Sequence, residues 1–149
     1  GLFLAGVVMA AAIALHNLPE GMVIGASYAA DLAEAGEDGR MMALVIGLHN
    51  IPEGMAVAVP LAAGGASRGR AVLTTAAAGA PTVLGAVLGF CLGTMGPGLQ
   101  MLTLGGASGA MLYVVFGELL PESFRLCRSP APVMAAVLGV LTGMGVVLG

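Results

Sequence analysis

Five long apolar segments make up most of this 149-residue chain. Only 9% of its residues are charged, whereas ordinary soluble domains carry about 25%. A soluble protein of this length could not cover its surface with so few polar side chains, so lipid must cover it instead. The sequence therefore predicts an all-α, polytopic transmembrane helix bundle. Its five predicted spans are Leu2–Ala30, Arg40–Ala63, Ala71–Leu92, Leu99–Leu126 and Pro132–Leu148.

The connections between these segments are short, and their composition is typical of loops. They hold clustered charges or the Gly and Pro residues of tight turns, as in GTMGPG. We therefore expect residues 1–149 to form a single transmembrane domain. The chain has no basic patch, so nothing supports a nucleic-acid partner. Three pairs of glycines spaced four apart, beginning at Gly85, Gly105 and Gly139, predict close helix contacts.

The arginines indicate the orientation of the bundle. The second loop carries Arg68 and Arg70, and the fourth carries Arg125 and Arg128, so by alternation these arginines share one side. The opposite side has only Arg40, next to four acids. The positive-inside rule places the arginine-rich side in the cytoplasm. We therefore expect a multi-pass protein of the plasma membrane with its C-terminus outside.

One seven-residue string occurs twice, as HNLPEGM from His16 and as HNIPEGM from His49. In each copy a glutamate, Glu20 or Glu53, follows the histidine by four residues. That spacing places both side chains on one helix face, a turn apart. Both copies fall near the middle of antiparallel neighbouring spans, so we expect two imidazoles and two carboxylates to converge near the bilayer midplane.

This polar group needs a physical reason, because an ionised carboxylate at the centre of a span costs about 2.5–3.5 kcal/mol. A single histidine on an apolar helix is more often hydrogen-bonded to a neighbouring helix than bound to a metal. The duplication favours a metal site, since a divalent cation neutralises both acids. Imidazole and carboxylate ligands suit Zn²⁺ and also Fe²⁺, Mn²⁺, Co²⁺, Ni²⁺ or Cd²⁺, which the sequence does not rank.

Pro19 and Pro52 interrupt the helical hydrogen bonding within the two strings. Each proline frees the carbonyl four residues earlier, on Leu15 or Leu48. Free carbonyls at membrane depth are tolerated where they line a cavity. The sequence therefore predicts a kinked, open turn in each copy, as in transport sites.

Two further acids lie in the string GELLPES of the fourth span. Glu122 lies near the cytoplasmic end, where Arg125 could pair with it. Glu118 is deeper, and two roles stay open for it: a ligand along a transport pathway or a hydrogen-bonded structural acid.

The paired strings resemble the fourth- and fifth-helix motifs of the ZIP (Zrt/Irt-like) metal-ion transporters, especially the broad-specificity, GufA-like bacterial members. The resemblance covers the whole chain and implies that its five spans are helices four to eight of eight. Helices one to three are then expected to be absent from this sequence. The resemblance also implies a homodimer and an external C-terminus, which agrees with the orientation predicted from the arginines.

The resemblance further implies a binuclear site. One metal position would use His16, Glu20, His49 and Glu53. The second would use Asn17 and Asn50, with both glutamates bridging. Family members usually add a sixth-helix glutamate, but Thr82 occupies that place here. A hydroxyl is a weaker cation ligand than a carboxylate, so one firm position is expected and the second is weakened or tuned to other ions.

These observations favour a transporter that moves a divalent metal ion into the cytoplasm, with the first two spans rocking against the rest. Only neutral imidazole binds metal, so protons should compete with it at the histidines. An intramembrane zinc hydrolase is the main alternative, but helical metalloproteases carry HExxH, and Asn17 and Asn50 cannot act as the base. A metal-binding membrane protein that does not transport is the other alternative. The chain is not expected to be an enzyme.

Overall fold

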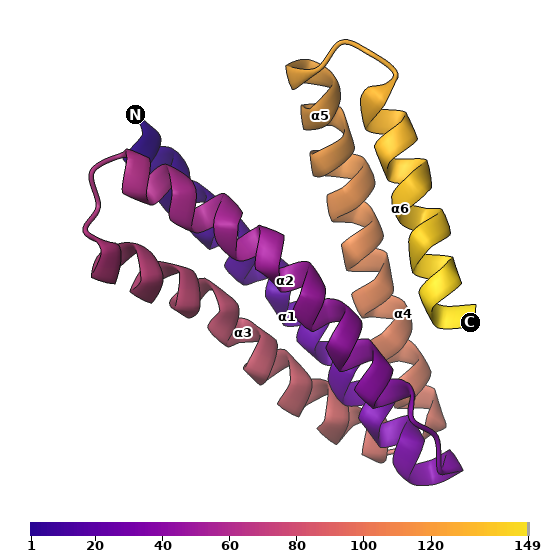
Figure 1. Cartoon of the computed structure of the whole chain (residues 1–149). Coiled ribbons are helices and arrows are strands. Elements are labelled where there is room, and N and C mark those ends of the chain that lie inside the picture. The colour runs from indigo at the N-terminus through magenta and orange to yellow at the C-terminus, as the bar shows by residue number, and fades with distance from the viewer. Residues whose placement is uncertain (149) are drawn as a thin grey trace. The chain divides into compact units, whose positions relative to one another are not determined.

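The computed structural model describes the backbone of residues 1–148, together with their side chains except those of Glu118, Glu122, Leu126 and residues 146–148. The described chain consists of helices joined by short connections, which confirms the predicted all-α class (Figure 1). The helices are α1 (Leu2–Glu34), α2 (Asp38–Ala63), α3 (Arg68–Thr94), α4 (Pro97–Tyr113), the π-helical segment η1 (Val114–Leu119), α5 (Leu120–Leu126) and α6 (Ala131–Leu148).

Four helical stretches are long and apolar enough to cross a membrane. They are α1, α2, α3 and the stretch Pro97–Gly117. A further apolar helical stretch, Ala131–Gly145, is shorter. At 1.5 Å per residue it reaches about 22 Å, less than the roughly 30 Å of a bilayer core. Four of the five predicted spans therefore meet the length criterion within the described chain.

The first loop is shorter than the sequence predicted. The acidic string from Asp31 to Arg40 was expected to be loop, but α1 continues to Glu34 and α2 already begins at Asp38. Two hydrogen bonds explain the early start of α2. The Asp31 carboxylate accepts from the backbone N–H groups of Asp38 at 3.0 Å and Gly39 at 2.8 Å. One acid at the end of α1 thus satisfies two free donors at the N-terminus of α2.

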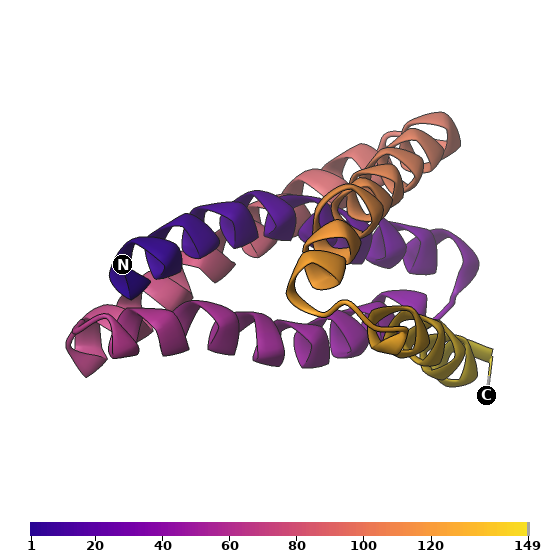
Figure 2. The same cartoon turned by 90° about the horizontal axis from the view of Figure 1, so that it is seen from above.

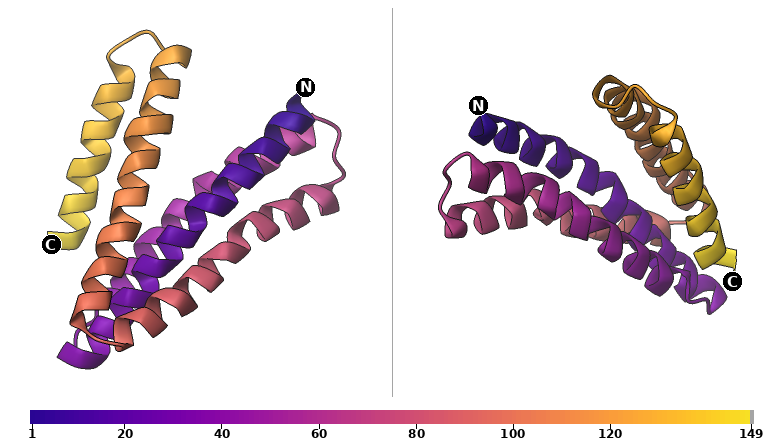
Figure 3. Two further views of the ribbon diagram at one scale, coloured as in Figure 1. Left: turned by 180° about the vertical axis from the view of Figure 1, so that it is seen from behind. Right: turned by 45° about the horizontal axis from the view of Figure 1, so that its top comes forward.

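The chain divides into two compact units, Gly1–Ala110 and a second unit that begins at Met111. In the first unit, α1 packs against both α2 and α3, and most extensively against α3 (Figures 1 and 3). Figure 2 shows α1 and α2 running alongside each other in opposite directions. Helix α1 is therefore the central helix of this unit.

Glycines allow α1 and α3 to touch backbone to backbone. A Cβ added to Gly21 would collide with the Thr82 carbonyl oxygen, and one added to Gly85 with the Leu18 carbonyl oxygen. Gly25 on α1 and Gly89 on α3 are equally tight, against Ala86 and Met22. The predicted close contact at Gly85 and Gly89 is therefore confirmed. The glycine pairs of α4 and α6 make no such contact within their own units.

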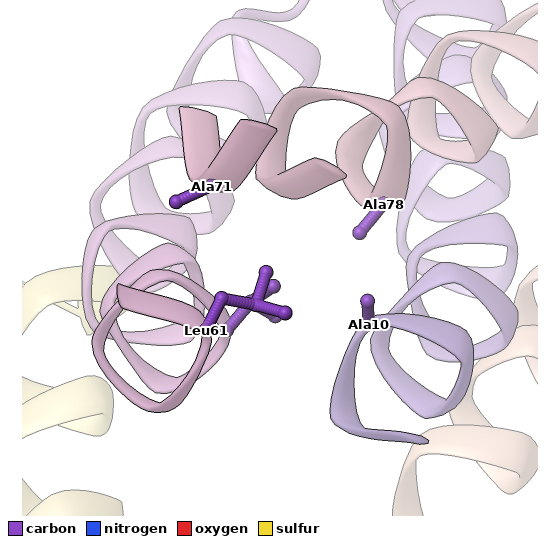
Figure 4. Close-up of a cluster of buried hydrophobic side chains, with 5 residues drawn as sticks. Ala10, Leu61, Ala71 and Ala78 are labelled. Carbon is purple, nitrogen blue, oxygen red and sulfur yellow. The ribbon is translucent and has the colours of Figure 1, made fainter. Parts of the chain in front are cut away.

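A small cluster of buried apolar side chains lies between α1, α2 and α3. Ala10 from α1, Leu61 from α2, and Ala71 and Ala78 from α3 point toward one another (Figure 4). Val57 completes the cluster and is fully buried. Because three of these five side chains are alanine, the helices pack closely with little side-chain volume between them.

In the second unit, α5 is followed by a short connection at residues 127–130, and α6 then runs back alongside it (Figure 1). The fourth predicted span is helical throughout, with one stretch of π-helix at η1. The side chains of Glu118 and Glu122, for which the sequence predicted roles, lie outside the described residues.

Candidate metal centre

The α1–α2 hairpin places the two copies of the repeated string at the same depth. Glu20 lies 14 residues before the end of α1 at Glu34, and Glu53 lies 15 residues after the start of α2 at Asp38. Antiparallel helices joined by a three-residue connection therefore bring these positions opposite each other. The two Asp31 hydrogen bonds fix the register of the hairpin at its loop.

Both copies are continuous α-helix through Pro19 and Pro52. The open turns that the sequence predicted are therefore wrong, whereas the kink and the free carbonyls of Leu15 and Leu48 stay predictions. A proline removes its own hydrogen bond, but the bonds on either side of it remain and can hold the helix together. Each string consequently keeps the spacing of four residues that places its histidine and glutamate on one face.

Four side chains from these two helices form a closed ring of alternating nitrogen and oxygen atoms. His16 Nε2 lies 3.2 Å from Glu20 Oε1 and 3.6 Å from Glu53 Oε1. His49 Nε2 lies 3.3 Å from each of the same two oxygens. The two imidazole rings are tilted by 59°, with centroids 6.4 Å apart. All four ligand atoms lie within 4.8 Å of one another.

These distances are close to the spacing of neighbouring ligand atoms in a zinc site. Zinc binds histidine nitrogen and carboxylate oxygen at roughly 2.0–2.2 Å, so neighbouring ligand atoms at the corners of a tetrahedron lie about 3.3–3.5 Å apart. The four nitrogen–oxygen distances of 3.2–3.6 Å lie within a few tenths of an ångström of that value. The residues could hold one divalent ion with little rearrangement.

The four ligand candidates differ in burial. Glu20 is buried, at 3% side-chain exposure, whereas the His49 side chain is 50% exposed. His16 and Glu53 lie between these values, at 11% and 16%. A carboxylate buried as deeply as that of Glu20 is unfavourable without a compensating positive charge. His49 is the most exposed of the four side chains in this chain.

The two asparagines of the repeat have different neighbours. The Asn17 amide nitrogen donates to the Ala78 carbonyl oxygen of α3 at 3.0 Å, and its own oxygen has no partner in the described part of the chain. The Asn50 amide lies instead beside both glutamates, 3.2 Å from Glu20 Oε2 and 3.0 Å from Glu53 Oε2. The prediction that both are ligands of a second metal stays a prediction.

The role of α3 was missed by reasoning from the sequence. Thr82 was compared only with a family position, yet its carbonyl oxygen touches Gly21, directly after Glu20. Its buried hydroxyl has no partner among the described residues. The pair Gly21 and Gly25, spaced four apart on α1 like Gly85 and Gly89 on α3, was the signal in the sequence for this contact.

Comparison with known proteins agrees with this chemistry. The profile described as "ZIP Zinc transporter" matches residues 1–149. The chain belongs to the ZIP zinc transporter family. It is also 40% identical over 114 residues, or 76% of its length, to the zinc transporter GufA of Myxococcus xanthus. That alignment covers 44% of GufA, so the chain spans less than half the length of this relative. No solved structure matches it.

Membership of the ZIP family bears on several predictions from the sequence. The family is one of transporters, which fits the expectation that the chain is not an enzyme. Together with four helices long and apolar enough to span a membrane, it makes the chain a multi-pass membrane protein.

Proposed function

We propose that this chain is the part of a ZIP transporter that binds and passes a divalent metal ion, with zinc as the main cargo. The observation that carries the proposal is the ring formed by His16, Glu20, His49 and Glu53. Its nitrogen–oxygen distances of 3.2–3.6 Å suit one divalent ion bound between the four side chains. We assign these four side chains as the ligands of the transported ion.

The ligands act by replacing the water around the ion. A hydrated divalent cation is costly to bring into a bilayer, and two carboxylates offset its charge while the imidazoles supply neutral donors. Without the ion, the ion-pair partners of the two acids among the described residues are the two imidazoles. Ion and site thus reduce each other's desolvation cost. The same ligand set would take Fe²⁺, Mn²⁺, Co²⁺, Ni²⁺ or Cd²⁺ as further cargo.

The remaining features of the transporter are part of the same proposal. We place residues 1–149 in one transmembrane domain, with α6 as a fifth span, in a plasma membrane. Arg68 and Arg70, which lie in the first turn of α3 and not in a loop, and Arg125 and Arg128, at and after the end of α5, favour a cytoplasmic side there, an external C-terminus and movement of metal inward. A homodimer rests on the family resemblance alone.

Uptake measurements with single substitutions test the proposal. Glu20→Ala and Glu53→Ala should each lower zinc uptake by cells expressing the full-length protein by more than about 100-fold. Even a change to a residue that only supports a metal ligand costs about 10–100-fold. Glu34→Ala removes an exposed acid from the end of the same helix and is the matched control, with uptake like the wild type. Unchanged uptake in both site variants would overturn the proposal.

A further inference from the structure

Each of the two site glutamates uses its two oxygens differently. The Oε1 atoms of Glu20 and Glu53 both face the histidine Nε2 atoms. The Oε2 atoms both face the amide of Asn50, at 3.2 and 3.0 Å. The amide nitrogen belongs at this position because a nitrogen donates to both carboxylates, whereas an oxygen would face two other acceptors.

A side-chain amide has two N–H groups, so one asparagine can donate to both carboxylates at once. A hydrogen bond to Oε2 limits rotation of each carboxylate and keeps Oε1 directed at the metal position. Hydrogen bonds to charged groups are also stronger than bonds between neutral groups. Asn50 would therefore hold both acidic ligands in place before the ion arrives.

We propose that Asn50 is a positioning residue that orients Glu20 and Glu53 toward a single metal ion, and that the site consequently binds one ion and not two. This inference rests on the proposed function, because it assigns the two glutamates as ligands. A second ion would need the Oε2 atoms that the Asn50 amide occupies. It would also approach two N–H donors, which repel a cation.

The corresponding residue of the first string cannot do the same in this arrangement. The Asn17 amide nitrogen is fixed to the Ala78 carbonyl oxygen on α3. Asn17 is also almost fully buried, at 2% exposure. The two asparagines thus have different hydrogen-bond partners. Asn17 connects α1 to α3, and Asn50 connects the carboxylates of Glu20 and Glu53.

Zinc binding by the purified protein in detergent tests this assignment. The number of ions is measured by elemental analysis after dialysis against known free zinc, and the affinity by competition with a chelator. The wild type should bind one zinc ion per protein chain. Asn50→Ala should also bind one, with an affinity about 10–100-fold lower, the usual effect of losing a residue that orients a ligand. Ile51→Leu, the neighbouring exposed residue, is the control and should behave like the wild type.

Asn50→Asp keeps the shape of the side chain but removes the N–H donors and adds a third carboxylate. It should bind a second zinc ion at high free zinc, or bind the first at least tenfold more weakly. One ion bound with wild-type affinity in both Asn50 variants would overturn the inference. Two ions in the wild type, reduced to one in Asn50→Ala, would also overturn it, because Asn50 would then be a ligand.

Failure of the proposed function has a different outcome in the same assay. If Glu20→Ala binds zinc as tightly as the wild type, the ring is not the metal site and the proposed function fails. If Glu20→Ala abolishes binding while both Asn50 variants match the wild type, the ring is the metal site and only the role of Asn50 is wrong.

Discussion

The two copies of the repeated string differ by one residue, Leu18 against Ile51, yet they have very different surroundings. The first copy lies on α1, which contacts both α2 and α3, and its Asn17 and Glu20 are buried. The second copy lies on α2, and its His49 is half exposed. Identical ligands therefore come with different supporting roles. The first copy contacts two helices of the bundle, and the second is the more exposed of the two in this chain.

The largest expected difference between the copies is at the glycine after each glutamate. Gly21→Ala should lower the free energy of unfolding by about 3 kcal/mol or more, because the new Cβ would overlap the Thr82 carbonyl oxygen and neither backbone can yield cheaply. Gly54→Ala should change it by less than about 1 kcal/mol, since its nearest neighbour is the Thr75 methyl group at 3.4 Å. Thermal unfolding in detergent measures both. Equal stability of these two variants would show that the copies are not differently packed.

A smaller effect is expected where the hairpin sets the register of the copies. Asp31→Ala removes two hydrogen bonds to the start of α2, so the protein should lose about 1–2 kcal/mol of stability. Zinc affinity should fall with it, because the second copy is no longer fixed opposite the first. Ser67→Ala removes the single capping bond of α3, and it should cost less and leave zinc affinity unchanged. Equal zinc affinity in the Asp31 variant and the wild type would contradict this role of the loop.

The smallest effect is expected from exchanging the one residue that distinguishes the copies. Ile51→Leu should change stability by about 0.5 kcal/mol or less, since Ile51 is exposed. Leu18→Ile should cost more, up to about 1.5 kcal/mol, because Leu18 is partly buried and its carbonyl touches Gly85. Unfolding midpoints of the two variants, measured side by side, decide the order. The reverse order would mean that the second copy is the more tightly packed.

The sequence predicted the helices and the four converging side chains because both follow from local rules. Apolar length defines a membrane helix, and a spacing of four residues places His16 with Glu20 and His49 with Glu53 on common faces. A three-residue connection then leaves α1 and α2 little choice but to pair. The two prolines misled the prediction, because the effect of one missing hydrogen bond depends on the bonds around it.

What the sequence could not predict depends on contacts between helices that are distant in the chain. The bond from Asn17 to Ala78 spans 61 residues, and no spacing rule reaches that far. The strings are nearly the same, so nothing local distinguishes the asparagine that faces α3 from the one that faces the acids. That distinction comes from the position of α1 between two neighbours.

The glycine contacts between α1 and α3 have a mechanical consequence for the metal centre. Two helices whose backbones touch have little room to turn or slide past each other, so we expect α1 and α3 to move together. Helix α2 packs this tightly against α1 near its two ends: Gly39 meets the Tyr28 backbone at one end, and at the other Gly64 meets the Phe3 backbone and Leu61 meets Gly6 of α1. The ring is divided equally between the two helices, with His16 and Glu20 on α1 and His49 and Glu53 on α2. A small movement of α2 would separate the two ligand pairs from each other while leaving each pair intact. An ion bound between them would then lose two of its four ligands.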